Sequence, residues 1–477
     1  MRDIRYLWED YQIFDYAGVE KHLSDMAARG WRLEKTGAMF WKYRRMEPAK
    51  VTYAVTYIHN ASDLNPQPTE EQQILDEYCQ EAGWKKVADW FTMQIFSSEE
   101  ADPIPIETDE ATRLEVIRRC TGMQIWPINI ALLLLFLLEA GMLLSNPITF
   151  FTRNSNVFLG LILLTGIILT AVTVGSYFLW SYRSEKSVKQ GGKCVSCGQF
   201  YRYFNRGILV LTLLLASGWF MSLLADSGKG IFAYAVLYMV LVYLIIILMR
   251  LSAKLMKRLG FSKKTNQIVL IIGNILLCIA LIGTLSYVFL HPDQNGESMI
   301  QKMVKNDTAE EDSAEKLPVT LQSLQRNVPS VQFSGLEALE SMEVNDDKQI
   351  EHSMRTREYS TCFMWQLQVD ELIKTEDEDL EWLTLSYDIL KVNLPFLYEK
   401  CRLEYMKNNS FTEERGAHYQ KEDASSWNAD RVYRWYYGED RPADEWVICQ
   451  GDYIVRLELS WEPSDGQKVW MMEQLCP

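Results

Sequence analysis

Histidine is scarce in this sequence: its 477 residues include five, namely His22, His59, His291, His352 and His418, and these are scattered. So few and scattered histidines argue against a histidine-based catalytic triad or metal centre. The motifs GxSxG and HExxH, the phosphate-binding P-loop and GxGxxG do not occur in a suitable context. These absences argue against kinase, protease and nucleotide-binding functions, and we expect a protein that is not an enzyme.

The chain also lacks a cleavable secretory signal at its beginning. Its opening residues, MRDIRYLWEDYQIF, include acidic side chains where an uninterrupted apolar stretch would be required. We therefore expect the N-terminal domain to stay on the side of the membrane where it is made, with the first membrane helix acting as the insertion signal.

Long apolar runs are present, in contrast, between Ile125 and Leu290. Five segments there contain about 20 predominantly apolar residues, the length of helix that crosses roughly 30 Å of hydrocarbon. We place these predicted spans at residues 125–145, 156–180, 207–225, 231–249 and 267–290.

The charges of the connections predict an orientation for these spans. The connections at 183–206 and 250–264 carry six Lys or Arg each, whereas the other two carry one each, Arg153 and Lys229. Connections rich in Lys and Arg stay in the cytoplasm. The sequence therefore predicts a multi-pass protein of the cell membrane with a cytoplasmic N-terminus and an extracellular C-terminus.

The C-terminal part is strongly acidic. From His291 to the end the chain has 19 Lys or Arg and 38 Asp or Glu, a net charge of −19, so the first 290 residues carry about +4 of the total of −15. Anionic lipid headgroups repel such a domain, which should stand clear of the bilayer. The acidity also argues against nucleic acid as a partner.

One pattern occurs twice near the N-terminus. MAARGWRLEKTG at residues 26–37 returns as CQEAGWKKVADW at residues 79–90. Glycine tolerates the left-handed conformation just past a helix end, so Gly30 and Gly83 predict two helix ends, and the tryptophans that follow, Trp31 and Trp84, predict packing anchors.

The elements expected in residues 1–100 follow the order β-α-β-β-α-β, which is that of a ferredoxin-like α+β domain. Residues 101–124 are predicted to be a linker, and 291–316 a flexible stalk. Residues 317–477 predict an acidic extracytoplasmic α+β domain. The predicted fold class is thus a multidomain membrane protein with a five-helix bundle between two α+β domains.

The first 100 residues resemble the bacterial family called domain of unknown function 2812, DUF2812. The resemblance lies in LSDMAARGWRLEK, the following aromatic pair Phe40 and Trp41, the strand-like YAVTY, and EYCQEAGWKKV. It implies a cytoplasmic module that commonly precedes membrane helices in Gram-positive bacteria and is often encoded beside PadR-like transcription regulators. A PadR-like regulator is therefore an expected protein partner by resemblance, and the family implies no catalytic residues.

Two cysteines, Cys194 and Cys197, lie close together in GGKCVSCGQF, in the predicted cytoplasmic connection. They can be reduced loop thiols, half of a tetrahedral zinc site, or a redox pair. A structural zinc site needs four ligands, and no second pair is nearby, so we expect no cofactor and keep zinc as the alternative.

The predicted external part contains four cysteines. An even number on an oxidising face allows two disulfides, although free thiols also pack well in apolar strands. The candidates for pairing are Cys362, Cys401, Cys449 and Cys476.

Two polar residues interrupt the predicted spans. Glu139 lies toward the outer end of the first span, where a carboxylate costs at least about 2.5 to 3.5 kcal/mol, so we expect it to face the bundle, bind a partner or be protonated. Asn274 in the fifth span is expected to hydrogen-bond to another helix.

These observations lead to a functional hypothesis. We expect a non-enzymatic membrane protein that links an external domain to a cytoplasmic module, in envelope sensing or regulation. The alternatives are a transport or membrane-enzyme component that uses the helix bundle, and an assembly scaffold.

Overall fold

The computed structural model describes most of the chain, and the predicted stalk lies outside the described residues. These are 3–37, 40–59, 61, 67–90, 92–196, 199–290, 317–328, 352–374, 382–407, 417–438 and 441–477. The contacts divide the chain into two compact units, each described by itself. The first comprises Met1–Glu139, Leu161–Ala216 and Ala235–Val288, and the second Ala140–Gly160, Ser217–Tyr234 and Phe289–Pro477.

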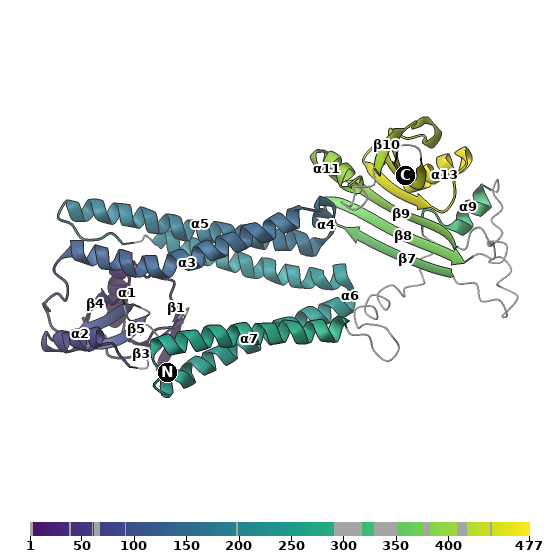
Figure 1. Cartoon of the computed structure of the whole chain (residues 1–477). Coiled ribbons are helices and arrows are strands. Elements are labelled where there is room, and N and C mark those ends of the chain that lie inside the picture. Colours follow the sequence, from purple (N-terminus) through teal and green to yellow (C-terminus); the bar gives the residue numbers. More distant parts are fainter. Residues whose placement is uncertain are drawn as a thin grey trace. The chain divides into compact units, whose positions relative to one another are not determined.

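The N-terminal domain repeats the order β-α-β-β twice (Figure 1). The first copy consists of β1 (Ile4–Trp8), α1 (Tyr16–Ala28), β2 (Trp31–Lys35) and β3 (Phe40–Arg45). The second consists of β4 (Thr52–Tyr57), α2 (Glu70–Glu81), β5 (Lys85–Trp90) and β6 (Met93–Ser98). Each copy forms an antiparallel three-stranded sheet of the same order, β1-β3-β2 and β4-β6-β5.

The repeat extends to an irregularity in each sheet. The register between β2 and β3 shifts between Leu33 and Lys35, and that between β5 and β6 shifts between Lys86 and Ala88. These positions are related by the same 53-residue spacing as Gly30 and Gly83. The two halves therefore share their topology and a bulge that increases the local twist of the sheet.

The predicted single βαββαβ unit is wrong in its strand count, because the described residues of this domain form six strands rather than four. Two segments that the sequence analysis took as one strand each are hairpins. The first is β2 with β3, and the second is β5 with β6, whose strands are separated by two residues.

Local signals fix the helix ends as expected. The Asp15 side chain accepts a hydrogen bond from the Gly18 amide at the start of α1, and Thr69 forms a capping box with Gln72 at the start of α2. At the other ends Gly30 has φ +82° and Gly83 has φ +80°. Both glycines thus occupy the left-handed conformation that the Gly-Trp repeat predicts.

Four apolar stretches are long enough to cross a membrane in the described part of the chain. They lie in α3 (Glu110–Leu144), in α5 (Asn154–Lys189), and in two parts of α6 (Gln199–Arg258), namely Tyr201–Leu223 and Met239–Met256. The fifth predicted span coincides with α7 (Lys263–Leu290), which has a shorter described apolar stretch, Lys264–Leu277.

The predicted linker at 101–124 requires a correction, because α3 begins at Glu110. The side chain of Asp109 accepts a hydrogen bond from the Ala111 amide, 3.0 Å away, which caps the helix. The first turns of α3 are amphipathic, and Leu114, Ile117 and Cys120 are buried in the core of the N-terminal domain. The apolar face of these turns is therefore part of the domain that the sequence analysis ended near residue 100.

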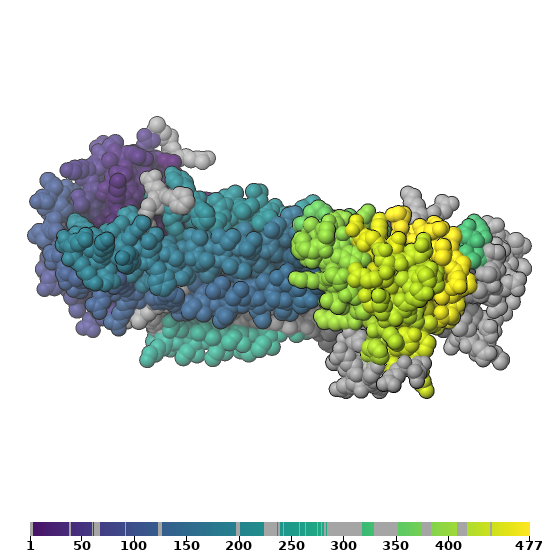
Figure 2. Space-filling view, turned by 90° about the horizontal axis from the view of Figure 1, so that it is seen from above, coloured from purple at the N-terminus to yellow at the C-terminus, as the bar shows by residue number. Residues whose placement is uncertain are grey.

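The C-terminal domain is built on one antiparallel sheet of seven strands, in the order β10-β11-β12-β13-β9-β8-β7. Its strands are β7 (His352–Ser360), β8 (Met364–Lys374), β9 (Trp382–Val392), β10 (His418–Glu422), β11 (Arg431–Tyr436), β12 (Pro442–Gln450) and β13 (Tyr453–Leu459). Its helices are α9 (Leu321–Asn327), α11 (Pro395–Tyr405), the 3-10 turn η2 (Ser425–Trp427) and α13 (Asp465–Leu475). This combination agrees with the α+β prediction, and Figure 2 shows the domain in green to yellow.

Apolar side chains alternate between two cores, one on each face of this sheet. Ile448 belongs to the core with α9 and α13, whereas its neighbour Val447 belongs to the core with α11. Successive strand residues point to opposite faces, so burial of both faces requires apolar residues at consecutive positions. Helices therefore cover both faces of the sheet.

The second core includes a segment from between the membrane helices. This segment is α4 (Pro147–Thr152), which lies between α3 and α5, and its Ile148 is buried in the core with α11. The Thr361 hydroxyl donates to the Phe151 carbonyl at 2.5 Å, and the Asn154 amide donates to the Ser360 carbonyl at 2.9 Å. The α3–α5 connection is thus an integral part of the C-terminal domain.

Candidate functional site

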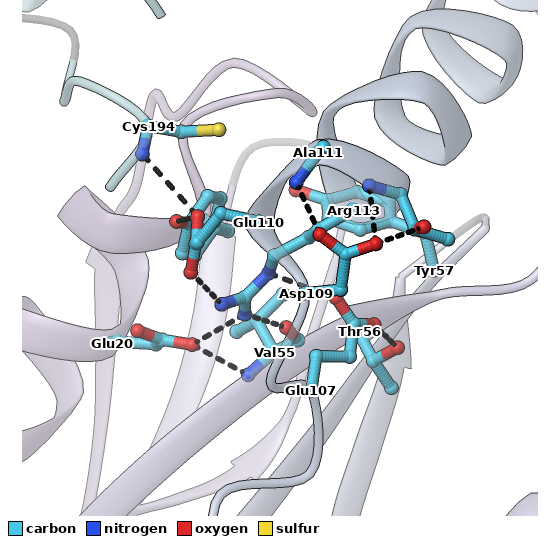
Figure 3. A network of polar contacts seen from close by, with 12 residues as sticks. Glu20, Val55, Thr56, Tyr57, Glu107, Asp109, Glu110, Ala111, Arg113 and Cys194 are labelled. Atoms are coloured by element: carbon cyan, nitrogen blue, oxygen red, sulfur yellow. Dashed lines mark hydrogen bonds and ion pairs between the residues drawn. The ribbon is translucent and has the colours of Figure 1, made fainter. Parts of the chain in front are cut away.

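The first turn of α3 places Arg113 inside the N-terminal domain (Figure 3). Its guanidinium forms ion pairs with three carboxylates, at 3.2 Å from Glu20, 3.0 Å from Glu107 and 3.3 Å from Glu110. It also donates to the Val55 carbonyl at 2.6 Å. The Arg113 side chain is 11% exposed, so these contacts are largely shielded from water.

The aromatic ring of Tyr16 completes this environment, because the Arg113 guanidinium lies 3.7 Å from its centroid. A cation over the face of an aromatic ring is attracted electrostatically. We call Arg113, Glu20, Glu107, Glu110 and Tyr16 the Arg113 network. It connects the first helix of the N-terminal domain to the first helix of the membrane region.

Among the carboxyls of the Arg113 network, that of Glu20 has a raised pKa, whereas that of Glu110 has a lowered one. Burial raises the pKa of its carboxyl from 4.5 to about 7, although the Arg113 guanidinium acts in the opposite direction. Glu20 also accepts a hydrogen bond from the Val55 amide at 2.8 Å. The protonation of this carboxyl therefore changes near neutral pH, where it affects contacts with both α3 and β4.

Glu110 extends the network to the connection between α5 and α6. It accepts hydrogen bonds from the Tyr16 hydroxyl at 2.9 Å and from the Cys194 amide at 3.3 Å. Burial raises the pKa of the Cys194 thiol to about 11, and Glu110 adds to this effect. At neutral pH Cys194 is thus a protonated, packed thiol.

The predicted Cys194 and Cys197 pair is not tested as a metal site, because Cys197 lies outside the described residues. Within the described ranges, no group of three or more His, Cys, Asp or Glu is placed to hold a metal ion. A zinc or redox role for this pair stays a prediction.

A second set of contacts joins the N-terminal domain to the start of α6. The Arg202 guanidinium donates to the Tyr11 hydroxyl at 2.6 Å, and the Arg206 guanidinium donates to the Trp8 carbonyl at 2.7 Å. Further bonds connect Asn205 to Asp10 and Gln12 to Tyr201. Residues 8–12 thus pair with residues 201–206, and we call this the α6 seam.

The end of α5 contributes a third attachment. Arg118 of α3 donates to the Ser181 hydroxyl at 2.8 Å and pairs with Glu185 at 2.7 Å. Phe14 packs against Tyr177 and Trp180, with ring centroids 5.6 and 4.9 Å apart. The N-terminal domain therefore contacts one end of each of α3, α5 and α6.

The structure separates the roles of the two predicted tryptophan anchors. Trp84 is buried with α2, and its indole nitrogen donates to the Ile104 carbonyl at 2.8 Å. Trp31 is partly buried against the main core of the domain. Both are packing residues, and Trp84 also holds the segment that leads to α3.

Glu139 lies on an exposed part of α3 in the described structure. The three options for its carboxylate, that it faces the bundle, binds a partner or is protonated, stay predictions. The side chain of Asn274 lies outside the described residues.

The four cysteines of the C-terminal domain are free thiols in the structure. Cys401 and Cys449 are buried in the core with α11, whereas Cys362 is exposed and Cys476 is partly exposed. Burial raises the pKa of Cys401 to about 12. This environment suits packed, protonated thiols.

Sequence reasoning missed the Arg113 network and the α6 seam. Glu107, Glu110 and Arg113 all lie in the segment 101–124, which was predicted to be a linker without a site. The available signal was the sequence ETDEATR, which sets four charged residues around a helix start. Its partner Glu20 is 93 residues away, so no local pattern indicated that the charges would be buried together.

Comparisons with known proteins add one finding. No curated protein and no solved structure matches this chain. A family model described as "Protein of unknown function (DUF2812)" matches residues 15–130. The match begins at the cap of α1, contains every residue of the Arg113 network, and ends within α3, about 30 residues beyond the boundary expected from the sequence. Residues 15–130 of this chain are therefore similar to the DUF2812 family, as the resemblance of the N-terminal domain implied.

Proposed function

We propose that this protein couples an extracytoplasmic domain to a cytoplasmic DUF2812 domain through shared membrane helices, as a non-enzymatic regulator of the cell envelope. One observation carries the proposal. Helix α3 begins in the Arg113 network and leads directly to α4, which is buried in the core of the C-terminal domain. The continuous segment formed by α3 and α4 thus contributes to the packing of both soluble domains, α3 to the N-terminal core and α4 to the C-terminal one.

The attachments of the two domains support the proposed orientation. The N-terminal domain contacts the connection at 183–206, which carries six Lys or Arg, whereas the C-terminal domain contacts the connection that carries only Arg153. The positive-inside rule assigns these two connections to opposite sides of the membrane. Five crossings, with the N-terminus cytoplasmic and the C-terminus extracellular, are consistent with both sets of contacts.

Coupling of this kind requires the helices to have two arrangements that a ligand or partner distinguishes. A ligand shifts such an equilibrium only by its difference in affinity for the two states. The Arg113 network offers a site where a change at α3 alters contacts with α1 and β4 together. The output would be a protein partner of the DUF2812 domain, for which a PadR-like regulator is the expectation from resemblance.

The alternative of transport through the bundle receives less support, because Glu139 is exposed on α3. A proton or ion relay needs buried polar groups that face one another. Substitution Glu139→Gln in cells tests the alternative, since a relay would lose its activity and a coupling protein would retain its response.

Hydrogen exchange of the full-length protein in phospholipid nanodiscs tests the coupling. The variant carries Phe151→Ala and Thr361→Ala, which remove contacts between α4 and the C-terminal domain. We expect exchange in α1 and β4, including the Val55 amide, to change about fivefold or more, the size of typical allosteric coupling. The matched control is Phe396→Ala, an α11 residue that is 71% exposed and should alter neither domain.

The decisive comparison is between the two domains of the same sample. If exchange rises around α11 while α1 and β4 stay unchanged, the helices do not transmit the perturbation, and the coupling proposal is wrong.

The proposed regulatory role is tested by transcript profiling under envelope stress with the Arg113→Gln and Arg119→Gln strains. An equal response in both would remove the regulatory claim.

A further inference from the structure

A cavity of about 430 Å³ lies between the N-terminal domain and the first turns of α6. Its walls come from the end of β1, from one side of α1, and from the α6 seam. The volume is within the range of small-molecule sites, roughly 300 to 1,000 Å³. Its position is distinct from the Arg113 network.

Three arginines line this cavity: Arg29, which directly follows α1, and Arg202 and Arg206 from α6. None of the three forms an ion pair with a described residue. Arg202 and Arg206 each donate one hydrogen bond to a neutral oxygen, and each guanidinium lies over an aromatic ring, at 4.5 Å from Tyr11 and 5.4 Å from Trp8. Guanidinium groups held this way keep free donors in a fork suited to phosphate.

The spacing of Arg202 and Arg206 adds to the argument. Like charges four residues apart on a helix repel each other, at a cost of about 0.2 to 0.5 kcal/mol. Both side chains are partly buried, which weakens their hydration. An anion bound between them would relieve this repulsion.

Two acidic residues also line the cavity, and they do not neutralise the arginines. Glu9 is 5% exposed and is bound to His22 at 2.9 Å and to the Tyr43 hydroxyl at 3.2 Å. Asp25 is exposed on α1. Three arginines against these two carboxylates leave the cavity with a net positive charge.

The cavity also has apolar walls and lies at the start of an apolar helix. Leu7, Trp8 and Met26 contribute to its lining. The membrane-length stretch Tyr201–Leu223 begins at the α6 seam, and Tyr203, which also lines the cavity, is 68% exposed. Tyrosine and arginine at the end of a membrane helix are typical of the headgroup region.

We propose that this cavity binds the phosphodiester headgroup of an anionic glycerophospholipid, with the phosphate between Arg202, Arg206 and Arg29. The apolar wall receives the glycerol and the start of the acyl chains. Basic pockets at the cytoplasmic end of membrane helices bind such headgroups. The inference rests on the membrane placement of α6 in the proposed function, but not on coupling between the domains.

Native mass spectrometry of the full-length protein tests this inference, with equal amounts of palmitoyl-oleoyl phosphatidylglycerol and phosphatidylcholine. We expect the wild type to retain phosphatidylglycerol selectively. Each arginine near an anionic lipid contributes about a factor of five, so Arg29→Gln should reduce the selectivity about fivefold and Arg202→Gln with Arg206→Gln about 25-fold. The exposed side chain of Arg29 forms no hydrogen bond or ion pair with a described residue, so its substitution leaves the domain folded.

Arg250→Gln is the matched control, because Arg250 is an exposed arginine of α6 outside the cavity. Unchanged selectivity in Arg29→Gln or in the double variant would overturn the proposal. Displacement of the lipid by an equal concentration of soluble glycerol phosphate would also overturn it, because the natural ligand would then be a soluble phosphate. If lipid selectivity is absent while the hydrogen-exchange experiment still shows coupling, the lipid inference fails and the proposed function stands.

Discussion

At the scale of single residues, Arg113 compensates a set of carboxylates that would otherwise repel one another. Three of them lie within 3.3 Å of its guanidinium, and its own side chain is largely buried. Buried ion pairs add little net stability when intact, but removal of one partner leaves an uncompensated charge. The network is therefore sensitive to the loss of its one described cation.

Substitution Arg113→Gln should destabilise the N-terminal domain by about 3 to 5 kcal/mol, because it leaves carboxylates buried without their cation. Hydrogen exchange of the full-length protein measures the change in α1 and β4. Arg119→Gln is the control, since Arg119 is an exposed arginine of the same helix. Equal protection in the two variants would show that the network does not stabilise the domain.

Glu20 gives the domain a dependence on pH. Its pKa is about 7 in the folded protein and 4.5 in the reference state, so the folded state binds the proton more tightly. The resulting stabilisation is complete below pH 4.5 and is lost as the pH rises toward 7, with a slope of at most about 1.4 kcal/mol per pH unit. A quarter of the side chain is exposed, so we expect a smaller slope.

The measurement is the unfolding free energy of wild type and Glu20→Gln between pH 4.5 and 7.5. The difference between them should change with pH in this window, whereas Glu47→Gln, an exposed glutamate, should follow the wild type. Parallel curves for wild type and Glu20→Gln would contradict the assignment.

At the scale of elements, the sequence predicted those features that depend on neighbouring residues. The Gly-Trp corners follow from a left-handed glycine after a helix, and both are present. At the β5–β6 hairpin no turn residue marked the reversal, because the two residues between the strands are Phe91 and Thr92. At the β2–β3 hairpin Gly37 was the available turn signal, and the strand prediction did not use it. The sequence could not predict the Arg113 network, because α1, β4 and α3 come together only in the folded domain.

The two corners should differ in their tolerance of a side chain. A Cβ at Gly30 would lie 2.8 Å from the Met46 carbonyl oxygen, which belongs to the backbone, whereas at Gly83 it would meet the flexible Glu100 side chain. Both positions have positive φ, which costs about 1 to 2 kcal/mol for alanine. Gly30→Ala should therefore destabilise the domain more than Gly83→Ala.

Thermal unfolding of both variants tests this order. Gly175→Ala serves as the control, because a Cβ there has nothing within 4 Å. A larger loss for Gly83→Ala than for Gly30→Ala would show that the second half of the repeat is the more rigid one.

At the scale of the whole molecule, the charge pattern and the domain contacts lead to one proposed topology, which native cysteines can test. Cys362 is exposed, whereas Cys401 and Cys449 are buried. A membrane-impermeant maleimide should label wild-type protein on intact cells, and Cys362→Ser should lose most of that label.

The opposite side is probed with Glu47→Cys in the Cys362→Ser background. Glu47 is exposed in the N-terminal domain, so the new thiol should react only after the cells are permeabilised. Labelling of this variant on intact cells would reverse the proposed topology.

The burial of α4 in the C-terminal domain has a consequence for biosynthesis. The Thr361 hydroxyl bonds to the carbonyl of Phe151, 210 residues earlier in the chain, and Ile148 fills part of the same core. The C-terminal domain, which the ribosome makes after the membrane helices, therefore closes around a segment that was synthesised much earlier. A fragment of residues 317–477 would lack α4 and would expose the apolar surface that α4 covers. We therefore expect this fragment to aggregate unless a peptide of residues 145–155 is added.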